Sequence, residues 1–437
     1  RRRWENFAFP PTHRNAADDA RCQHATPLFC NSWDELWAMP SIPEPIKHAN
    51  QLQIKSEIRT LEIKHTDGSP SHTFCLPQVD TGHVILENVS VFGRDLWMYN
   101  DCTFFACGFR LPSRDSAFSS IDGLDKPKAV VTLDRAAVLP PKHMRNFYHF
   151  AVEGMTNMAL LFDQVFPGLS REPLPNQDKP LVLLVGASSQ GERIFAYEIF
   201  VLISKARPDI ALTLEWYDVK KRYDIGELHL VDWYPSPDPI AECPDGSSPA
   251  SEAFSSYYAP CELIEKHAAL MHSTVSRKVP EQDTIVFFSR STSPRDDRRL
   301  VNEELLLGPL KSRILDFNIA HGTRYRLATH DGSLTVEEQI RLLRRAKVAF
   351  GTHGAGMSTV MHTLPGAALI EFALDGPDVH QFFKHIATCV GAEYYVADGL
   401  VSRFHDNLVL ESPRHDKAIA DFIDTVMDIL TRALPEE

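Results

Sequence analysis

The stretch KVAFGTHGAGMSTVMHTLPGAALIEF, residues 347–372, contains the pattern that decides the fold. Its two ends, KVAF and ALIEF, are short apolar runs with the composition of buried strands. Between them, Gly351, Gly354 and Gly356 allow the backbone to turn sharply and other groups to approach it closely. A strand, a glycine-rich loop and a second strand in this order indicate an open α/β sheet, which binds ligands beyond the carboxyl ends of its strands.

Strands and helices are expected to alternate on both sides of this stretch. Toward the amino terminus we expect antiparallel strands within 75–110, strands at 128–134, 180–188, 212–217 and 227–234, and helices at 144–166 and 192–206. Nearer the stretch we expect strands at 284–289 and 313–317 and helices at 301–310 and 335–345, the last opened by a capping box of Thr335 and Glu338. An amphipathic helix at 417–434 carries a stripe of Ile419, Phe422, Ile423, Val426, Ile429 and Leu430.

The chain length and one break in the pattern indicate two α/β domains. The 437 residues suffice for two or three domains, and the segment 235–260, rich in proline and serine, interrupts the alternation. We expect residues 1–127 to be an N-terminal extension and the β-rich part of the first domain. Residues 128–260 then form the first α/β domain, 261–410 the second and 411–437 a C-terminal helix. Two such domains facing one another would leave a ligand-binding cleft.

Composition narrows the class of protein. A net charge of −13 disfavours sequence-independent binding to nucleic acid. The longest apolar run, at 194–203, has ten residues, against the ~20 that a membrane-spanning helix needs. Eight cysteines, with the close pairs Cys22/Cys30, Cys102/Cys107 and Cys243/Cys261, and one sequon at Asn88 favour disulfides and a secretory compartment. The targeting segment would then precede this sequence. Metal binding is less favoured than disulfides, because neither CxxC nor HExxH occurs.

The glycine-rich loop has the character of an anion cradle. Backbone amides of Gly354, Ala355 and Gly356 at the start of a helix would face a phosphate or pyrophosphate, and the ring of His353 could add a donor. The loop matches neither the dinucleotide fingerprint nor the P-loop. It resembles the oxyanion loop of α/β-hydrolases, but the nucleophile elbow GxSxG is absent from the sequence. A structural turn with a satisfied histidine is the alternative.

Glu371 ends the strand that follows the cradle. A carboxylate at that position can accept hydrogen bonds from two ribose hydroxyls. An ordinary capping or salt-bridge role is the alternative.

An arginine-rich loop at 287–304 would supply the other half of the pocket. Arg290 directly follows a predicted strand, and Arg295 lies further along the loop; guanidinium groups suit phosphate oxygens. Asn302, near the next helix, would orient the loop or cap the helix. A solvated loop whose arginines pair with neighbouring aspartates is the alternative.

The first α/β domain contains candidate residues for proton transfer. If 143–157 is helical, Asn146, His149 and Glu153 share one face, and Arg145 lies one turn before His149. His149 with Glu153 could act as a general base with its partner. Asp134, at the predicted end of its strand, is a second candidate base, and a histidine satisfied in the core is the alternative.

The sequence lacks the paired acidic residues that commonly hold a metal ion against a diphosphate. No DxD sequence occurs, so arginine, histidine and backbone amides would have to offset the charge of a departing diphosphate. No metal ligand is therefore predicted, and a divalent ion is allowed without being required.

Three segments together resemble glycosyltransferase family 61. They are NFYHFAVEG at 146–154, FFSRSTSPRDDRRLVNEEL at 287–305 and the stretch from Thr335 to Phe372, within a resemblance that covers about residues 140–375. The resemblance implies a GT-B fold of two Rossmann-like domains, the first on the acceptor side and the second on the UDP-sugar side, with the C-terminal helix crossing back. It also implies an inverting transferase with a UDP-sugar as donor and no required cofactor, in a type II membrane protein of the Golgi or ER lumen.

The resemblance also assigns residues and activities. Arg290, Asn302, His353, Gly354, Ala355, Gly356 and Glu371 fall in its UDP-binding blocks, and Asn146 and His149 in its N-terminal block. The expected reaction is β-1,2 transfer of xylose from UDP-xylose to a mannose-containing glycan, or else transfer of GlcNAc from UDP-GlcNAc to a glycan or glycoprotein. Two alternatives of other classes are a glycan-binding protein without turnover and a hydrolase that uses the HGAG loop.

Overall fold

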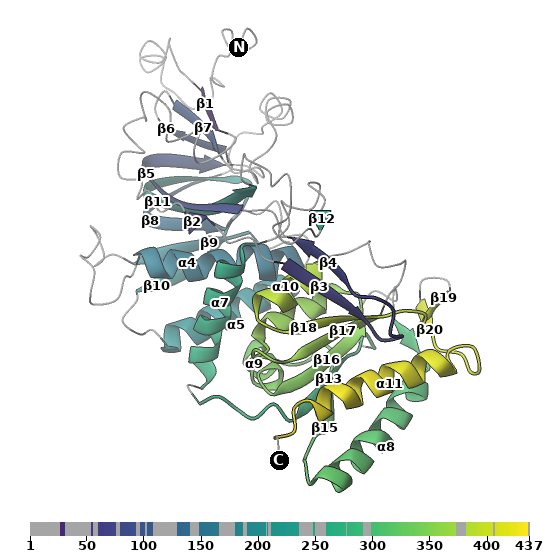
Figure 1. Ribbon diagram of the computed structural model, residues 1–437. Coiled ribbons are helices and arrows are strands. Elements are labelled where there is room, and N and C mark those ends of the chain that lie inside the picture. The colour runs from purple at the N-terminus through teal and green to yellow at the C-terminus, as the bar shows by residue number, and fades with distance from the viewer. Residues whose placement is uncertain are drawn as a thin grey trace, which may run out of the picture. The chain divides into compact units, whose positions relative to one another are not determined.

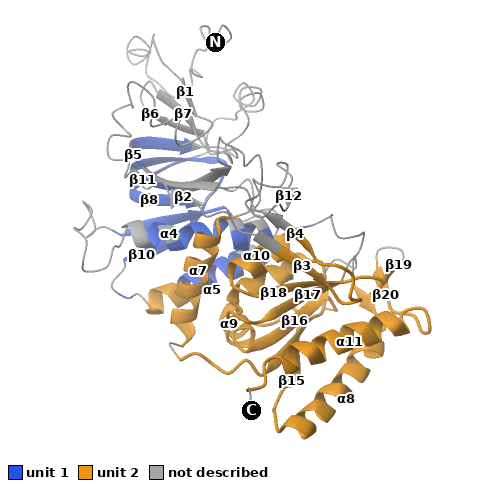
Figure 2. Cartoon of the chain, viewed as in Figure 1, with its two compact units in different colours: residues 1–57, 77–200, 207–239 blue, residues 58–76, 201–206, 240–437 orange. Residues whose placement is uncertain are grey.

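A computed structural model of the chain describes residues 27–30, 54–55, 60–75, 79–92, 97–100, 103–107, 129–139, 148–165, 180–186, 190–206, 208, 211–235, 248–249, 259–276, 278–291, 299–372, 382–404 and 407–435. The chain divides into two compact units, coloured separately in Figure 2. Unit 1 comprises Arg1–Glu57, Pro77–Phe200 and Arg207–Pro239, and unit 2 comprises Ile58–Leu76, Val201–Ala206 and Ile240–Glu437. The α/β class expected from the sequence is confirmed, since helices accompany sheets that contain parallel strands in both units.

Unit 1 contains one mixed sheet. Its strands follow the order β1 (Pro27–Cys30), β7 (Thr103–Cys107), β6 (Trp97–Asn100), β5 (Val79–Phe92), β11 (Lys221–Pro235), β8 (Ala129–Leu139), β9 (Leu181–Val185) and β10 (Leu212–Trp216), and β2 (Ile54–Lys55) pairs with β5. The strands β11, β8, β9 and β10 run parallel, as predicted for 128–235. The strands β5, β6 and β7 pair antiparallel, as predicted for 75–110.

The predicted helix at 144–166 is regular over only part of its length. Residues His149–Gly154 form a π-helix, η5, and Thr156–Val165 form the α-helix α4. The amide of Met155 donates to the carbonyl of Phe150, five residues back, at 3.0 Å. The hydroxyl of Thr156 donates to the carbonyl oxygen of Val152. This bond competes with the α-helical bond from a backbone amide to the same oxygen. The α-helical spacing assumed for His149 and Glu153 is therefore wrong. The second predicted helix is confirmed as α5 (Gln190–Ala206).

Unit 2 contains a second sheet, which carries the stretch quoted first. Its strands follow the order β12 (Ser248–Pro249), β4 (His72–Cys75), β3 (Thr60–His65), β18 (Glu393–Ala397), β17 (Ala368–Phe372), β16 (Ala346–Thr352), β13 (Thr284–Phe288) and β15 (Arg326–His330). All strands from β3 to β15 are parallel. Three short strands, β14 (Leu300–Val301), β20 (Asn407–Val409) and β19 (Ser402–Phe404), form a separate small sheet.

Helices cover both faces of this sheet (Figure 1). The helices α7 (Cys261–Val275), α9 (Val336–Leu343), α10 (Phe382–Cys389) and the 3₁₀-helix η6 (Ala355–His362) pack against one another. The helices α8 (Glu304–His321) and α11 (Asp416–Thr431) pack together beside β16. Successive residues of a strand point to opposite faces of the sheet. Phe287 and Phe350 belong to the core under α8 and α11, whereas the equally buried Val286 and Ala349 do not.

The C-terminal helix α11 confirms the predicted apolar stripe, all six residues of which are buried. The ring of Phe422 lies 5.1 Å from that of Phe350 and 5.8 Å from that of Phe372. This aromatic cluster fixes α11 on the sheet of unit 2. The expectation that this C-terminal helix crosses back onto the first domain stays a prediction.

The predicted strand at 313–317 is also wrong, because α8 continues through it. Buried residues recur along α8 with helical period, namely Leu306, Leu310, Ile314 and Phe317. The helix passes Pro309 without a break and ends at His321, and Gly322 after it adopts φ 65°. The neighbouring helix α9 begins with the predicted capping box, in which Thr335 and Glu338 exchange hydrogen bonds.

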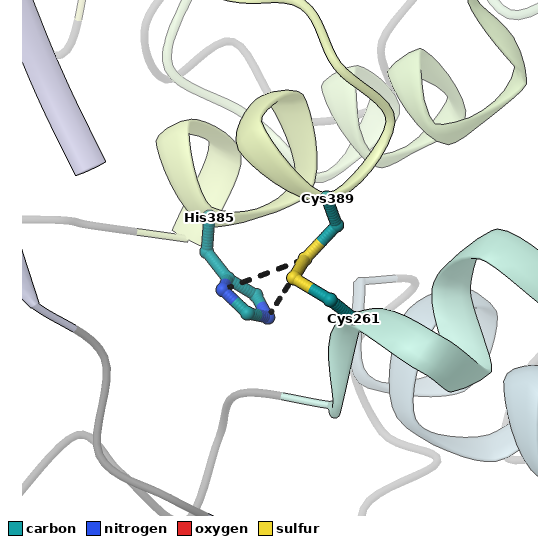
Figure 3. Close-up of side chains that lie close together, drawn as sticks. All are labelled: Cys261, His385 and Cys389. Carbon is teal, nitrogen blue, oxygen red and sulfur yellow. Dashed lines mark hydrogen bonds between the residues drawn. A yellow bond between two sulfur atoms is a disulfide. The ribbon is translucent and has the colours of Figure 1, made fainter. Parts of the chain in front are cut away.

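A disulfide between Cys261 and Cys389 joins the first residue of α7 to the last residue of α10 (Figure 3). The suggested pair Cys243/Cys261 is therefore wrong, because the true partner lies 128 residues along the chain. His385, one turn before Cys389, lies 3.6 Å from the Sγ atom of Cys389 through its Nε2 atom, which also contacts the carbonyl of Ala259 at 2.7 Å.

Removing this disulfide should lower stability. In the double variant Cys261→Ala/Cys389→Ala, the unfolded chain regains the freedom of a loop of 128 residues. We expect the free energy of unfolding to fall by about 2–4 kcal/mol. Equilibrium urea denaturation of wild type and variant measures this difference, and unchanged midpoints would show that the bond does not stabilise the fold.

None of the helices in the described ranges combines the length and apolar character required to cross a membrane.

Candidate functional site

The order of strands in unit 2 reverses between β13 and β16. From β13 the chain continues to β15 on one side, and then returns to add β16, β17 and β18 on the other side. The segments that follow β13 and β16 therefore diverge and leave a crevice at the carboxyl ends of these strands. Arg290 follows β13, and Gly354 follows β16. The two parts of the predicted cradle thus meet where open α/β sheets bind ligands.

Two glycines of the loop are required by close contacts. A Cβ atom on Gly351 would lie 2.8 Å from the carbonyl oxygen of Phe288, so the ends of β16 and β13 can approach only with glycine there. A Cβ atom on Gly354 would lie 2.2 Å from the Nη1 atom of Arg290. The guanidinium group of Arg290 therefore packs directly on the backbone of the predicted cradle.

A pocket of about 270 Å³ opens at this point. Ten residues line it: Phe288, Ser289, Arg290, His330, Asp331, Gly332, Thr352, Gly354, Gly356 and Met357. They come from the ends of β13, β15 and β16 and from the start of η6. Sequence reasoning missed His330 and Asp331, because the strand at 326–330 was not predicted. It did not single out Thr352, although this residue lies within the glycine-rich stretch.

Two buried polar atoms beside this pocket form no hydrogen bond within the described residues: the hydroxyl of Thr352 and Nε2 of His330. The side chain of Gln339 lies next to His330 without reaching hydrogen-bonding geometry. Buried polar groups normally have partners, so the pocket is suited to a polar ligand.

The charges around the pocket have different signs and different environments. Burial lowers the pKa of His330 below its ordinary value, which favours the neutral ring. Hydrogen bonds from Ser333 lower the pKa of Asp331, which stays a carboxylate. Arg290 therefore brings a positive charge to the pocket lining, and Asp331 brings a carboxylate, a group that accepts hydrogen bonds.

Burial raises the pKa of Glu303 behind the pocket. The hydroxyl of Ser289 donates to Oε1 of Glu303 at 2.9 Å, which ties the end of β13 to the start of α8. This bond holds the segment that carries Arg290.

His353 and Glu371 are in direct contact, although sequence reasoning assigned them separate roles. Nδ1 of His353 bonds Oε1 of Glu371, and the hydroxyl of Tyr394 donates to Oε2 of Glu371 at 2.6 Å. The ring of His353 also packs on Phe383, at 4.9 Å between ring centres. Both oxygens of Glu371 are thus engaged, and its exposed fraction is 6%. Ribose binding by Glu371 stays a prediction and would require one of these bonds to be exchanged.

The helix η6, which begins within the cradle, is anchored by buried histidines. Nε2 of His272 contacts the carbonyl of His362 at 2.9 Å. Burial lowers the pKa of His267, His272 and His362, so these rings favour the neutral state. They support the position of the loop.

The remaining predicted site residues are distributed over both units. Ala355 and Gly356 form the first turn of η6, and Gly356 is exposed. Asn302 has φ 63° and donates from Nδ2 to the carbonyl of Leu410 at 3.3 Å, so it orients the turn before α8. Asp134 is exposed in β8, but this strand continues to Leu139, so its expected place at the strand end is wrong.

Other predicted residues lie outside the described part of the chain. They are Arg145, Asn146 and Arg295, together with the side chains of His149 and Glu153, for which only the backbone in η5 is described.

Unit 1 contains a buried ionic cluster that sequence reasoning missed. Oε1 of Glu227 receives a hydrogen bond from Nε of Arg135 at 2.6 Å and contacts Nε2 of His229 at 2.7 Å. Burial acts to raise the pKa of Glu227, but His229 and Arg135 outweigh it and lower the pKa to about 2. Arg135, which directly follows Asp134 on β8, pairs in register with Glu227 on the neighbouring strand β11, and His229 lies two residues further along β11.

Two sets of side chains in the described residues have the composition of metal sites. One is Cys261, His385 and Cys389, but its sulfur atoms are joined in the disulfide and provide no thiolate. The other is His65, Asp67 and Asp398, at the carboxyl ends of β3 and β18, whose nitrogen and oxygen donors suit a divalent cation.

Comparison with known proteins identifies one family. The family model described as Glycosyltransferase 61 matches residues 82–370, more than half of the chain. The match begins within β5, earlier than the resemblance seen in the sequence, and includes β13 and β16. No match is found among curated proteins.

Proposed function

The chain belongs to glycosyltransferase family 61, and we propose that it is an inverting transferase. In this proposal, the diphosphate of a UDP-sugar binds at Arg290 and at the backbone of residues 354–356. Membership of the family implies a sugar donor and a glycan acceptor. The observation that carries the proposal is the contact between the guanidinium group of Arg290 and the backbone of Gly354 at the reversal point of the unit 2 sheet.

The proposed site offsets the charge of the departing nucleotide. As the bond between the anomeric carbon and the phosphate oxygen breaks, negative charge develops on the diphosphate. Arg290 keeps its positive charge throughout turnover. The amides of Ala355 and Gly356 lie at the N-terminal end of η6, where donors face an anion. In this proposal His353 adds a ring donor.

The acceptor hydroxyl supplies the attacking oxygen. It forms the new bond to the anomeric carbon from the face opposite the diphosphate, and its proton passes to a base. Among candidate bases we retain His149, Glu153 and Asp134, with Arg145 and Asn146 as acceptor-binding residues. The products are the glycosylated acceptor, UDP and a proton held by the base.

For the donor we propose UDP-xylose, with β-1,2 transfer to a mannose-containing glycan in the Golgi or ER lumen. The Cys261–Cys389 disulfide and the exposed position of Asn88 in its sequon support a secretory compartment. Transfer of GlcNAc remains the alternative that the same experiment distinguishes.

A panel of nucleotides and nucleotide sugars tests the proposal. We expect UDP, but neither GDP nor NAD, to raise the thermal unfolding midpoint; at one hundred times its Kd a ligand adds about 2.7 kcal/mol to the unfolding free energy. We expect release of UDP from UDP-xylose to increase when a mannose-containing acceptor is added. Faster release from UDP-GlcNAc would favour the alternative donor. Binding of glycans with no UDP release from any donor would contradict an enzymatic function.

A further inference from the structure

Unit 2 has a second pocket, of about 510 Å³, at the edge of its sheet opposite the candidate site. Its walls are the connection between α7 and β13 and the end of α9, and α7 packs against α9 (Figure 1). The connection leads into the amino end of β13, and α9 leads into the amino end of β16. The candidate site follows the carboxyl ends of the same strands, so the length of the strands separates the two pockets.

Cationic side chains dominate the lining of this second pocket, which we call the arginine pocket. Its charged lining residues are Lys278, Glu281, Arg341, Arg344 and Arg345. In the sequence RLLRRAK, the spacing i, i+3 and i+4 brings the three arginines to one side of the end of α9. Glu281 is the only acidic residue among the described residues of the lining.

Two of the arginines have acidic partners. Arg341 donates to Oε1 of Glu337, one turn earlier on α9, at 2.7 Å, and both side chains are largely exposed. Nε of Arg345 donates to Oδ1 of Asp283 at 3.0 Å. An exposed pair within one helix contributes little to stability, so Arg341 can exchange Glu337 for a ligand.

Arg344 is a buried cation that forms no ion pair within the described residues. Its exposed fraction is 4%, and its Nη1 and Nη2 atoms donate to the carbonyls of Ser276 at 2.8 Å and Lys278 at 2.9 Å. Its Nε atom is buried and has no partner in the same part of the chain. Burial, followed by the charge of Arg341, lowers the pKa of Arg344. Because buried charges are normally compensated by an opposite charge, the wall of the arginine pocket carries a positive charge that lacks its counter-ion.

Lys278 brings a second cation without an acidic partner in the described ranges. Its backbone is held by the bond from Arg344 to its carbonyl and by the bond from its amide to Oγ of Ser276 at 3.1 Å. The residue itself is exposed. The ammonium group is therefore available to a ligand that enters from solvent.

We propose that the arginine pocket binds the phosphate group of a small soluble molecule, with Lys278 and Arg341 as direct donors and Arg344 as the fixed charge behind them. A phosphate group carries about two negative charges and three acceptor oxygens, so it can compensate two cations and accept bonds from two chain segments. A carboxylate carries one charge and would leave one of the two cations uncompensated. Val279 and Pro280 also line the pocket and offer an apolar surface to the rest of the molecule.

Calorimetric titration of the full chain at low ionic strength, with inorganic phosphate and with glucose 1-phosphate, measures this binding. All variants carry Arg290→Ala, because phosphate could otherwise also bind at the proposed diphosphate site. We expect both phosphates to bind to Arg290→Ala itself. Sodium acetate, which provides a carboxylate, should bind at least about tenfold more weakly.

Variants of the arginine pocket locate the site. Adding Lys278→Ala and Arg341→Ala should weaken binding of both phosphates by at least about tenfold, because each removes a charged donor. The matched control is Lys311→Ala, which removes an exposed lysine of α8 and should leave the affinity unchanged. Arg344→Gln should also weaken binding; should it fail to fold, the comparison with Lys311→Ala still decides.

Three results would overturn the inference. They are no phosphate binding to Arg290→Ala, acetate binding as tight as that of phosphate, and an equal loss of affinity in Lys311→Ala and in the variant of Lys278 and Arg341. The proposed function is tested separately, because Lys278→Ala/Arg341→Ala in an otherwise unchanged chain should bind UDP as wild type does. Failure of wild type to bind UDP would overturn that function and leave phosphate binding at the arginine pocket standing.

Discussion

Arg290→Ala should reduce UDP-sugar turnover by at least about 100-fold, since it removes the positive charge that packs on the cradle. The guanidinium group packs on Gly354 and lines the pocket at the reversal point of the sheet. Without this charge, the amides of the loop and His353 would have to stabilise the departing diphosphate. The rate of UDP release at saturating and limiting donor gives kcat and kcat/KM for the comparison.

Two further variants sharpen this result. Arg290→Lys should recover only part of the rate, because an ammonium group cannot reproduce the planar fork of donors. Arg313→Ala is the control: this exposed residue of α8 forms an ion pair with the exposed Asp424 at 3.6 Å, and we expect unchanged kinetics. Wild-type turnover in Arg290→Ala would remove Arg290 from the site.

Gly354→Ala should lower activity by roughly 10–100-fold while the fold is retained. The added methyl group would lie 2.2 Å from the Nη1 atom of Arg290, so the guanidinium group must move. It is the far end of a flexible side chain, so we expect the free energy of unfolding to change by less than about 1 kcal/mol. Parallel measurement of UDP release and urea denaturation separates the two effects.

The matched control for this variant is Gly308→Ala. A Cβ atom on Gly308 meets no atom within 4 Å, and the residue lies in α8. We expect normal activity and a helix stabilised by about 0.5–1 kcal/mol. Equal activities of Gly354→Ala and wild type would mean that the close approach of Arg290 to the backbone is not used in catalysis.

Elements with a complete local pattern could be predicted from the sequence. The α11 stripe has helical period over about three turns, and α9 carries a capping box, so neither depends on distant residues. The strands β16 and β17 are short, apolar and separated by glycines. The run at 313–317 has only five residues, too few to distinguish a strand from a helix, and the stripe from Leu306 to Phe317 decides for a helix.

Features that depend on distant segments could not be predicted. Cys261 and Cys389 meet only because α7 and α10 pack together. The hairpin β3–β4 extends the sheet of unit 2, although the next strand, β5, belongs to unit 1. Arg290 and Gly354 could be predicted, because each follows a strand that is recognisable in the sequence. The bond from Tyr394 to Glu371 could not, because it depends on the pairing of β17 with β18.

Hydrogen–deuterium exchange with and without UDP tests the central claim most directly, because it locates the nucleotide on the chain. We expect slower exchange of backbone amides at 288–291, 330–332 and 352–357, the segments that line the pocket. The amides of Gly354, Ala355 and Gly356 should show the largest change. Protection confined to other segments, with these three unchanged under saturating UDP, would contradict the assignment of the diphosphate to Arg290 and the glycine-rich loop.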